Sequence, residues 1–389
     1  MSLLFLLSIS LFCLFIVGLS LLDIRQQVLA PKLTACKEQP LEQPLISVLI
    51  PARNEAAGIG LCLQGLAHQF YPSFEVIVVD DDSTDGTADI ARYYQTRLRS
   101  LEIVAGVPLP NGWTGKCWAC WQAAARARGQ WLLFLDADIV PKPELLHTLI
   151  THAHSSGADL ITLIPLLQMH SLSERLVLPA FQRILYNLYP LHRVSNPCES
   201  LAFANGQCLF IRHAVYQTTG GHQAVRSSVL EDTDFGQMVK RSGYRLFAAS
   251  APDLLEVRMY TDWSSVAEGL SKNAVAGYRS GGRRSAWVGL RQALIAFAPF
   301  YLIGSSITID FLHYDTPISA VLLIYGMITA ILVGICSAWL VRHRYRIAGI
   351  WGGLYPLGLA IYFGLAGRAL LRLRRRQGVI WKGRVIHDA

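Results

Sequence analysis

Four long apolar runs flank a more polar centre in this chain, and they restrict its fold more than any other feature of the sequence. The first run covers residues 3–22 and holds no charge, and about 20 apolar residues are enough to cross a bilayer as a helix. Because no basic residue precedes this run and no small-residue cleavage site follows it, we expect an uncleaved anchor rather than a signal peptide. The other three runs lie in the C-terminal quarter, at residues 292–309, 317–341 and 347–367.

The composition also indicates a membrane location. Only 16% of the residues are charged and 52% are hydrophobic, whereas soluble domains carry roughly 25% charged residues. The net charge of +8 arises from residues 342–389, where ten arginines and lysines accompany one acidic residue, Asp388. Because these cations stand beside apolar runs and not in an aromatic-interleaved patch, they favour contact with a membrane surface and argue against nucleic acid as a partner.

The arginines predict which side of the membrane each loop faces. The loop at 310–316 lacks Lys and Arg and should face outward, whereas Arg342, Arg344 and Arg346 should face the cytoplasm. Residues 23–291 would then lie on the cytoplasmic side of the cell (inner) membrane. Four complete crossings would place the basic tail outside, against the preference of its arginines. One of the last three runs is therefore a candidate for an interfacial or re-entrant segment. Pro299 in the first of them and Pro356 in the third single out these two runs.

The centre of the chain alternates short apolar strands with amphipathic helices. Strands are expected at 46–50, 75–80, 102–105 and 131–135, and helices at 59–69, 88–98 and 116–127. This alternation is typical of an α/β domain with a mostly parallel sheet, in which ligands bind at the carboxyl ends of the strands. We therefore divide the chain into an anchor (1–25), a linker (26–44), an α/β domain (45–286), membrane helices (287–371) and a basic tail at the cytoplasmic face (372–389).

Acidic residues, not glycines, follow these strands. No GxGxxG follows the first strand and no GxxxxGK[ST] occurs, so the fingerprints of dinucleotide oxidoreductases and P-loop proteins are missing. Asp136-Ala137-Asp138 closes the strand at 131–135, where one carboxylate can face a nucleotide ribose while the other reaches a divalent cation. Carboxylates and diphosphate oxygens suit Mg²⁺ or Mn²⁺, so Asp136 and Asp138 are predicted metal ligands, although the triplet alone also suits a plain surface turn.

Several short motifs occur in a fixed order and together resemble the inverting family 2 glycosyltransferases with the GT-A fold. In chain order they are Pro51-Ala52-Arg53-Asn54-Glu55, Val78-Val79-Asp80-Asp81-Asp82-Ser83, Gly115-Lys116, Asp136-Ala137-Asp138 and Glu231-Asp232. The resemblance covers roughly residues 45–275. It implies a Rossmann-like α/β catalytic domain with a mostly parallel sheet, here with N-terminal and C-terminal transmembrane or interfacial helices.

The resemblance implies a role for each matching residue. Lys116 would approach the diphosphate, Asp138 would bind the metal and Asp232 would act as the base, with Glu231 beside it. Arg53, Glu55 and the Asp80/Asp81 pair would line the uridine pocket. The complete implied set for binding the nucleotide-sugar is Pro51, Arg53, Glu55, Asp80, Asp81, Lys116, Asp136, Lys272, Trp381, Lys382 and Arg384.

Motifs in the loop before Lys116 and in the last part of the chain resemble one group within that family. These motifs resemble ceramide glucosyltransferases, hopene-associated glycosyltransferases and carotenoid (diaponeurosporenoate) glycosyltransferases. They are Gly112-Trp113-Thr114-Gly115-Lys116-Cys117-Trp118-Ala119, Gly269-Leu270-Ser271-Lys272-Asn273 and Trp381-Lys382-Gly383-Arg384. Polysaccharide synthases of the family carry a (Q/R)xxRW motif after the acidic pair, and this chain has none. The resemblance therefore implies transfer of a single sugar to a lipid.

The acidic cluster Glu231-Asp232-Thr233-Asp234 precedes Phe235, Met238 and Val239 at helical spacing, so it should lie at a helix N-terminus. There the helix dipole favours the ionised form of a carboxylate, which a base must hold before reaction. With the resemblance, Asp232 is the predicted base, Glu231 orients it or the acceptor, and Asp234 caps the helix. Plain capping by Asp232 or Asp234 is the alternative.

Three other features have a simpler interpretation beside a functional one. Cys117 and Cys120 form a lone CxxC, which fits buried small residues on one helix better than a metal or redox site. His147, His152 and His154 share a predicted helix, but no acidic or cysteine partner is spaced with them. The aromatic stretch at 181–189 suits an acceptor groove, a helix at the membrane surface or core packing.

The sequence thus predicts a membrane-bound, metal-dependent inverting glycosyltransferase that uses Mg²⁺ or Mn²⁺. It would move a single hexose from a nucleotide-sugar, UDP-linked by resemblance, to a carotenoid, hopanoid, sphingoid or glycerolipid acceptor. Two alternatives stay open: a processive polysaccharide synthase, and a catalytically inactive glycosyltransferase-like membrane scaffold. The product of incubation with donor and lipid extract discriminates among them.

Overall fold

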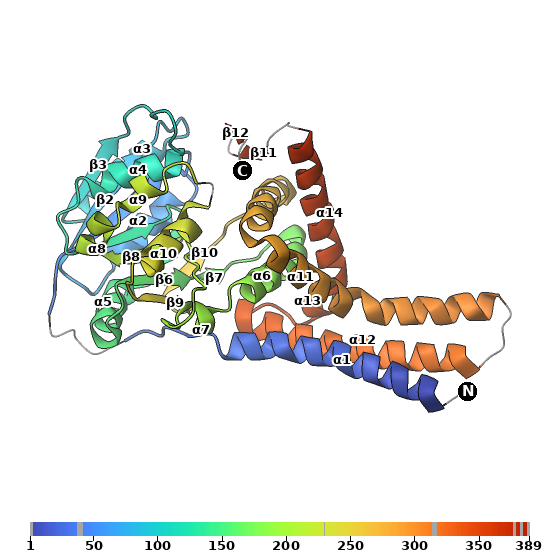
Figure 1. The fold of residues 1–389 in the computed structure, drawn as a ribbon. Helices are drawn as coiled ribbons and strands as arrows, with labels where there is room; N and C mark the ends of the chain where they lie inside the picture. Colours follow the sequence, from blue (N-terminus) through green and yellow to red (C-terminus); the bar gives the residue numbers. More distant parts are fainter. Residues whose placement is uncertain are drawn as a thin grey trace. The chain divides into compact units, whose positions relative to one another are not determined.

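The computed structural model describes residues 3–36, 42–228, 230–312, 317–375, 379–381 and 384–386. The chain forms two compact units (Figure 1). The sheet unit comprises Ala30–Gln168 and Leu191–Met259. The helical unit comprises Met1–Leu29, Met169–Pro190 and Tyr260–Ala389, so the chain passes between the two units several times.

A seven-stranded sheet forms the centre of the sheet unit, with the order β3-β2-β1-β4-β8-β6-β9. Every neighbouring pair is parallel except those that involve β8, which runs antiparallel to β4 and β6. The predicted α/β fold with a mostly parallel sheet is therefore confirmed. The strands are β1 (Ile46–Ala52), β2 (Phe74–Asp80), β3 (Leu101–Ala105), β4 (Trp131–Leu135), β6 (Leu160–Ile164), β8 (Cys208–Arg212) and β9 (Leu246–Ser250).

Helices and a second, three-stranded sheet complete this unit. The small sheet has the order β5-β10-β7, with β5 at Ile139–Pro141, β7 at Leu166–Leu167 and β10 at Leu255–Val257. The helices are α2 (Ile59–Ala67), α3 (Thr87–Tyr93) followed by the 3₁₀ turn η1 (Tyr94–Thr96), α4 (Gly115–Ala124), α5 (Leu145–Ser156), α7 (Leu191–Val194), α8 (His213–Thr218), α9 (Gly221–Ala224) and α10 (Glu231–Arg241).

The central strand β1 runs further than the sequence predicts. Its ladder with β4 stops at Leu49↔Phe134, whereas its ladder with β2 continues to Ala52↔Asp80. Pro51 has no N–H to donate, and it lies beyond the end of the β4 ladder. The strand expected at 46–50 is therefore two residues too short, because pairing with β2 continues past Pro51.

The cysteine pair of α4 faces the interior. Cys117 and Cys120 are both buried on this one helix, as the simpler interpretation predicts. Burial raises the pKa of the Cys117 thiol to about 12, which keeps it protonated at neutral pH. All eight cysteines of the chain lie in the described ranges, and all are free thiols.

The helical unit combines segments that are far apart in the sequence. Its elements are α1 (Leu3–Val28), α6 (Leu172–Leu188), α11 (Trp263–Phe311), α12 (Pro317–Tyr345), α13 (Ile350–Gly353), α14 (Tyr355–Arg374), β11 (Val379–Trp381) and β12 (Arg384–Ile386). The aromatic stretch predicted at 181–189 lies on α6, where Phe181, Ile184 and Tyr186 are buried. The side chains of this stretch thus pack inside the helical unit.

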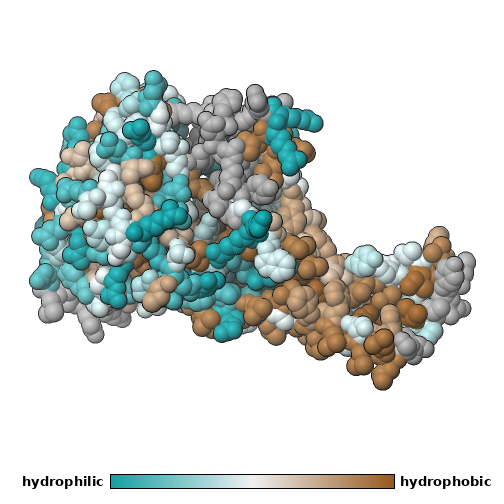
Figure 2. All heavy atoms as spheres, viewed as in Figure 1, coloured by the Kyte–Doolittle hydropathy of each residue, from teal (hydrophilic) through white to brown (hydrophobic). Residues whose placement is uncertain are grey.

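Four of these helices are long and apolar enough to cross a membrane. They are α1, the Gly282–Phe311 segment of α11, α12 and α14, and they match the four apolar runs of the sequence. Gly282 has a φ of 48°, outside the helical region, and kinks α11 where its apolar segment begins. Large apolar side chains such as Leu4, Leu11 and Ile335 are exposed on α1 and α12, where Figure 2 shows a predominantly hydrophobic surface.

Candidate active site

The carboxyl ends of three neighbouring strands bring the predicted motifs to one edge of the large sheet. β1 pairs in parallel with β2 up to Ala52↔Asp80, so the loop that starts at Arg53 lies beside the loop that starts at Asp81. β4 lies on the other side of β1, and Asp136 directly follows it. The strand order β2-β1-β4 therefore gathers three motifs that are separated along the chain.

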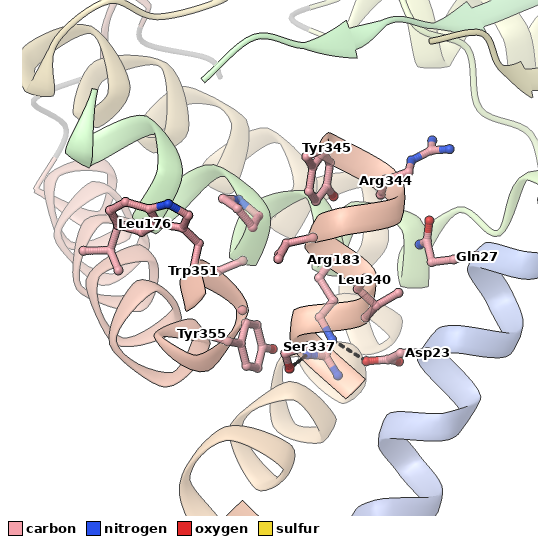
Figure 3. Close-up of a pocket in the computed structure, with 14 residues that line it drawn as sticks. Asp23, Gln27, Leu176, Arg183, Ser337, Leu340, Arg344, Tyr345, Trp351 and Tyr355 are labelled. Atoms are coloured by element: carbon pink, nitrogen blue, oxygen red, sulfur yellow. Dashed lines mark hydrogen bonds and ion pairs between the residues drawn. The ribbon is translucent and has the colours of Figure 1, made fainter. Parts of the chain in front are cut away.

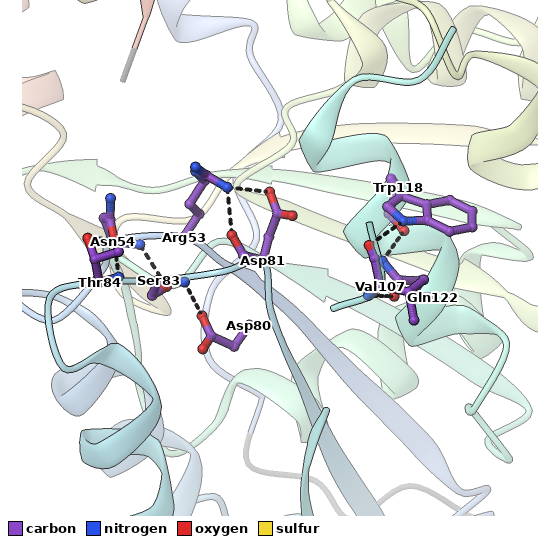
Figure 4. A network of polar contacts seen from close by, with 9 residues as sticks. All are labelled: Arg53, Asn54, Asp80, Asp81, Ser83, Thr84, Val107, Trp118 and Gln122. Carbon is purple, nitrogen blue, oxygen red and sulfur yellow. Dashed lines mark hydrogen bonds and ion pairs between the residues drawn. The ribbon is translucent and has the colours of Figure 1, made fainter. Parts of the chain in front are cut away.

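Hydrogen bonds join the loops after β1 and β2 (Figure 4). The N–H of Asn54 donates to Ser83 Oγ at 2.9 Å, and the N–H of Thr84 donates to Asn54 Oδ1 at 2.9 Å. Asn54 and Asp82 have φ values of 53° and 60°, a left-handed conformation that asparagine and aspartate tolerate better than most residues. Asp80 Oδ1 accepts from the N–H of Ser83 at 3.2 Å, so this carboxylate stabilises its own turn.

The other predicted nucleotide-binding residues belong to the same pair of loops. Arg53 Nη1 donates to the carbonyl oxygen of Asp81 at 2.7 Å and lies 3.5 Å from Asp81 Oδ2. The N–H of Glu55 donates to Thr87 Oγ1 at 2.8 Å, and Thr87 Oγ1 in turn donates to Asp85 Oδ1. Arg53, Glu55, Asp80 and Asp81 are thus held in one network of loop contacts.

Lys116, at the start of α4, lies among carboxylates from two other elements. Its Nζ is 2.7 Å from Asp136 Oδ1 and 3.4 Å from Glu231 Oε1. Burial alone would lower the pKa of this ammonium, but Asp136, Glu231 and Asp232 hold it well above its usual range. Lys116 is therefore a permanent cation that joins the end of β4 to the start of α10.

Asp232 is the carboxylate with the most altered acidity in this cluster. Its Oδ2 accepts from the N–H of Gly206 at 2.8 Å, and its Oδ1 accepts from the N–H of Thr233 at 2.7 Å. Desolvation and then the neighbouring Glu231 raise the pKa of Asp232 to about 6, against the opposing effects of Lys116 and the two N–H groups. A carboxyl group with such a pKa exchanges protons near neutral pH, as a general base must.

Of the two expectations for this helix start, one needs correction. With a pKa of about 6, Asp232 is ionised at neutral pH, as a base must be before reaction, although desolvation and Glu231 raise that pKa. Asp234 was expected to cap the helix, but Leu230 occupies the N-cap position and no side chain caps it. Asp234 Oδ2 instead accepts from the hydroxyl of Ser228 at 2.6 Å.

A small cavity opens at this cluster. Five predicted site residues line it, namely Pro51, Lys116, Asp136, Glu231 and Asp232. The remaining lining residues are Cys120, Phe134, Leu135, Gly206, Leu209 and His222. The cavity thus has one apolar wall from β4 and β8 and one charged wall from α4 and α10.

The residues after β4 suit a hard divalent cation. Asp138 follows Asp136 by two residues, and the two carboxylates both act on Cys62, whose thiol pKa is raised first by burial and then by Asp138 and Asp136. A Cβ at Gly58 would lie 2.9 Å from the Cα of Asp138, so only glycine allows this close approach of the loop after β1. Among the described residues there is no group of three or more His, Cys, Asp or Glu that could hold a metal. Two carboxylates plus diphosphate oxygens are nevertheless a donor set that Mg²⁺ and Mn²⁺ accept.

The other predicted residues lie in the helical unit. Lys272 is on α11, and the backbones of Trp381 and Arg384 belong to β11 and β12. Lys382 lies outside the described residues. Their role in binding the nucleotide-sugar stays a prediction.

Two residues of the cavity have no signal in the sequence. His222 is 2% exposed, its ring lies 4.6 Å from that of Phe134, and burial lowers its pKa to about 3, so it is neutral. Its Nδ1 lies 3.1 Å from the hydroxyl of Tyr216. A Cβ at Gly206 would lie 2.9 Å from Lys116 Nζ and 3.2 Å from Asp232 Oδ2. An isolated histidine and an isolated glycine carry no sequence motif, so their place in the site becomes evident only from the fold.

Comparison with known proteins shows which families and folds this chain is similar to. Residues 47–219 match the family model "Glycosyl transferase family 2". The chain is 28% identical over 245 residues to a 4,4'-diaponeurosporenoate glycosyltransferase of Staphylococcus haemolyticus, covering 60% of this chain and 62% of the relative. It is 36% identical over 120 residues to the glycosyltransferase AglE of Haloferax volcanii, covering 30% of this chain and 38% of that protein. The chain thus spans less than two thirds of the length of these relatives.

A solved structure supports the fold assignment. The mannosyltransferase PcManGT of Pyrobaculum calidifontis, determined with GDP-Man and Mn²⁺, superposes with a TM-score of 0.51 at 18% identity over 93% of this chain and 99% of that chain. With the strand order given above, this similarity shows a GT-A-like core with helices at both ends.

Proposed function

Because residues 47–219 match the model of glycosyl transferase family 2 and the chain is similar to a diaponeurosporenoate glycosyltransferase, we propose that the protein is a membrane-bound inverting hexosyltransferase. It would move one hexose from a nucleotide-sugar to a lipid acceptor. The observation that supports this proposal most directly is the proximity of Asp232, whose pKa is about 6, to the Lys116–Asp136 ion pair in one cavity.

In this proposal Asp232 is the general base. For a hydroxyl acceptor, the acceptor oxygen forms a bond to the anomeric carbon while the bond from that carbon to the diphosphate oxygen breaks on the opposite face. Asp232 takes the acceptor proton, which makes the oxygen a better nucleophile. The N–H groups of Gly206 and Thr233 keep the carboxylate in one orientation before and after the transfer.

Lys116 and the acidic residues after β4 would bind the diphosphate end of the donor. The ammonium of Lys116 is a fixed cation at the cavity and would pair with phosphate oxygens. Asp136 and Asp138 would hold Mg²⁺ or Mn²⁺, which when bound neutralises negative charge on the leaving diphosphate. Lys116 already pairs with Asp136, so this ion pair holds the ammonium of Lys116 in position at the cavity.

The loops after β1 and β2 would bind the nucleoside. Arg53, Glu55, Asp80 and Asp81 lie together there, and Pro51 lines the cavity at the end of β1. The resemblance implies uridine, whereas the solved relative was determined with GDP-Man. We propose a UDP-linked donor, and the test below includes both nucleotides.

A lipid acceptor would explain why a glycosyltransferase domain shares a chain with four helices that are apolar enough to cross a membrane. The name of the staphylococcal relative specifies diaponeurosporenoate, an apolar carboxylic acid, as its substrate. We therefore propose a carotenoid, hopanoid, sphingoid or glycerolipid acceptor, reached from the cytoplasmic side of a multi-pass protein in the cell membrane.

The test is a product analysis with the full chain in detergent. The protein is incubated with UDP-glucose or GDP-mannose, Mg²⁺ and a membrane lipid extract, and lipids are separated and identified by mass spectrometry. We expect one new lipid whose mass increases by a single hexose, formed by the wild type and not by Asp232→Asn. A polymer would support a processive synthase instead. Absence of any product with all donors would support an inactive scaffold.

A further inference from the structure

A second cavity lies entirely within the helical unit (Figure 3). Its walls come from α1, α6, α12, α13 and the start of α14, and they are mostly apolar, with Leu176, Pro179, Leu340 and Trp351 among them. It shares no lining residue with the cavity at the sheet. Nothing in the proposed reaction requires it.

One arginine is buried in the wall of this mostly apolar cavity. Arg183, on α6, is 6% exposed. Its Nε donates to Asp23 Oδ2 at 2.6 Å, its Nη1 donates to Ser337 Oγ at 3.0 Å, and its guanidinium carbon lies 4.3 Å from the ring centre of Tyr355. Its Nη2, however, is buried and has no hydrogen-bond partner among the described residues. A buried donor without an acceptor is costly, and it normally indicates a missing partner.

The charges around Arg183 do not balance. The carboxylate of Asp23 also accepts from Arg291 Nη2 and from Gln292 Nε2, the latter at 3.0 Å. One carboxylate thus faces two guanidinium groups. A third, that of Arg344, also lines the cavity, but it is half-buried and lies 4.3 Å from the ring centre of Tyr186. Buried charges are ordinarily paired, so the cavity has an unmet need for negative charge.

We propose that this cavity binds the oxyanion of an amphiphile, with Arg183 Nη2 as the principal donor. A carboxylate or phosphate group would accept from Nη2 and offset the excess positive charge, since guanidinium groups suit both anions. The first part of an apolar chain would lie against Leu176, Leu340 and Trp351. The ligand class is therefore a long-chain carboxylic acid or an anionic phospholipid, and a soluble anion such as inorganic phosphate alone would lack the apolar contacts.

The chain provides a matched pair of variants to test this site. Arg183→Gln removes the charged donor but keeps a polar side chain, while Asp23 retains Arg291 and Gln292 as partners. Arg342→Gln makes the same change at an exposed arginine of α12 that does not line the cavity. Leu176→Trp narrows the cavity and leaves every charged residue in place.

Native mass spectrometry of the full chain in dodecyl maltoside measures the binding of oleate, methyl oleate, dioleoylphosphatidylglycerol and inorganic phosphate. We expect one molecule of oleate or of the phospholipid to bind at least about ten times more tightly than methyl oleate, because a hydrogen bond between charged groups is lost in the ester. Whichever anion binds identifies the source of the oxyanion. Arg183→Gln should weaken this binding by about tenfold, and Arg342→Gln should leave it unchanged.

Several results would overturn the proposal. They are equal binding of oleate and methyl oleate by the wild type, binding of inorganic phosphate as tight as that of the amphiphiles, and full binding by folded Arg183→Gln. If Arg183→Gln does not fold, Leu176→Trp decides, because it must lose the bound amphiphile. Full binding by Leu176→Trp would equally refute the site.

Discussion

Opposing influences act on the carboxylate of Asp232. Two backbone N–H groups and Lys116 favour its ionised form, whereas desolvation and Glu231 favour its protonated form. The second pair prevails and the pKa of Asp232 rises to about 6. The pKa of Asp232 should therefore change when any one of these neighbours is removed, and a titration can measure that change.

The pH dependence of activity is the first prediction. A base acts when ionised, so kcat/KM should fall as the pH drops below about 6, the pKa of Asp232. Glu231→Gln removes a negative neighbour, which should lower the pKa of Asp232 and move this loss of activity to lower pH. Asp232→Asn should lower kcat by at least ~10²-fold at every pH while the donor still binds. If the loss of activity at low pH occurs at the same pH in Glu231→Gln as in the wild type, or if Asp232→Asn is active, Asp232 is not the base.

Gly206 gives a second prediction at this scale. An alanine Cβ there would lie 2.9 Å from Lys116 Nζ and 3.2 Å from Asp232 Oδ2, so one or both groups must move. Displacement of catalytic groups by about 1 Å costs on the order of 10²-fold in rate, so Gly206→Ala should lose most of its kcat. Gly60→Ala is the control, since its Cβ would meet only Ile90 Cγ2 at 3.5 Å. Equal kcat values for the two variants would exclude a positioning role for Gly206.

Metal dependence is the third prediction. If Asp138 ligates the cation, Asp138→Asn should nearly abolish turnover, because a charged ligand that stabilises the leaving diphosphate is lost. The wild type should be inactive in EDTA and recover activity on titration with Mn²⁺ or Mg²⁺. A thermal unfolding curve establishes that the variant is folded. Undiminished activity of folded Asp138→Asn, or of the wild type in EDTA, would rule out the metal assignment.

At the scale of elements, Lys240 fixes the position of α10. Its Nζ donates to the carbonyl oxygens of Val194, Asn196 and Leu201, at 2.6, 2.9 and 2.7 Å. Val194 ends α7, and Asn196 and Leu201 lie in the irregular segment that follows it. The ammonium thus anchors this segment to the same helix that begins with Glu231 and Asp232.

Replacement of Lys240 tests this anchor. Lys240→Met keeps the apolar stem and leaves three carbonyl oxygens without their donor, so the free energy of unfolding should fall by about 1–3 kcal/mol. Arg241→Met changes an exposed neighbour on the same helix and should have little effect. Thermal unfolding of the two variants, followed by circular dichroism, provides the comparison. A melting temperature of Lys240→Met equal to that of Arg241→Met would show that the three bonds contribute nothing net.

Local sequence patterns predicted the bounds of an element well where its burial follows from its apolar run. They predicted the bounds less well where pairing with distant segments determines them. The strand at 131–135 was recognised because it is buried on both faces, and β4 has those bounds. The end of β1 was misplaced, because only the neighbouring strands show that pairing passes Pro51. Similarly, the sequence placed α6 within the α/β domain, whereas Arg183 on this helix bonds to α1 and α12. Contacts between distant segments leave no periodic signal.

For the site, the sequence indicated the charged residues but not the apolar wall or the neutral histidine. Acids at strand ends have a reason that can be stated in advance, since parallel strands present their carboxyl ends at one edge. His222 owes its place to α9, a helix of four residues, and its neutral state to burial among Phe134, Tyr216 and Phe235. Neither the short helix nor the burial can be inferred from the residues around it.

At the scale of the whole molecule, the distribution of cysteines allows the proposed topology to be tested. Among the eight cysteines, all of which lie in the described ranges, Cys198 in the sheet unit is exposed and six others are buried. The segment between the two apolar helices α11 and α12 carries no lysine or arginine, which favours an outward position. Leu312, at the end of α11, is 57% exposed and offers a position for a reporter on that side.

The last prediction is that a membrane-impermeant maleimide does not label Cys198 in intact cells and labels it once the membrane is permeabilised. The physical reason is that the arginines at 342, 344 and 346 hold their end of α12 in the cytoplasm, so the sheet unit, which precedes α11, should lie on the same side. Leu312→Cys, in a background with Cys198→Ser, should show the opposite behaviour and react in intact cells. Labelling of Cys198 from outside would reverse the topology and would separate the proposed catalytic domain from cytoplasmic nucleotide-sugars. If neither position reacts before permeabilisation, α11 and α12 do not cross as a pair, and their apolar surfaces are then interfacial.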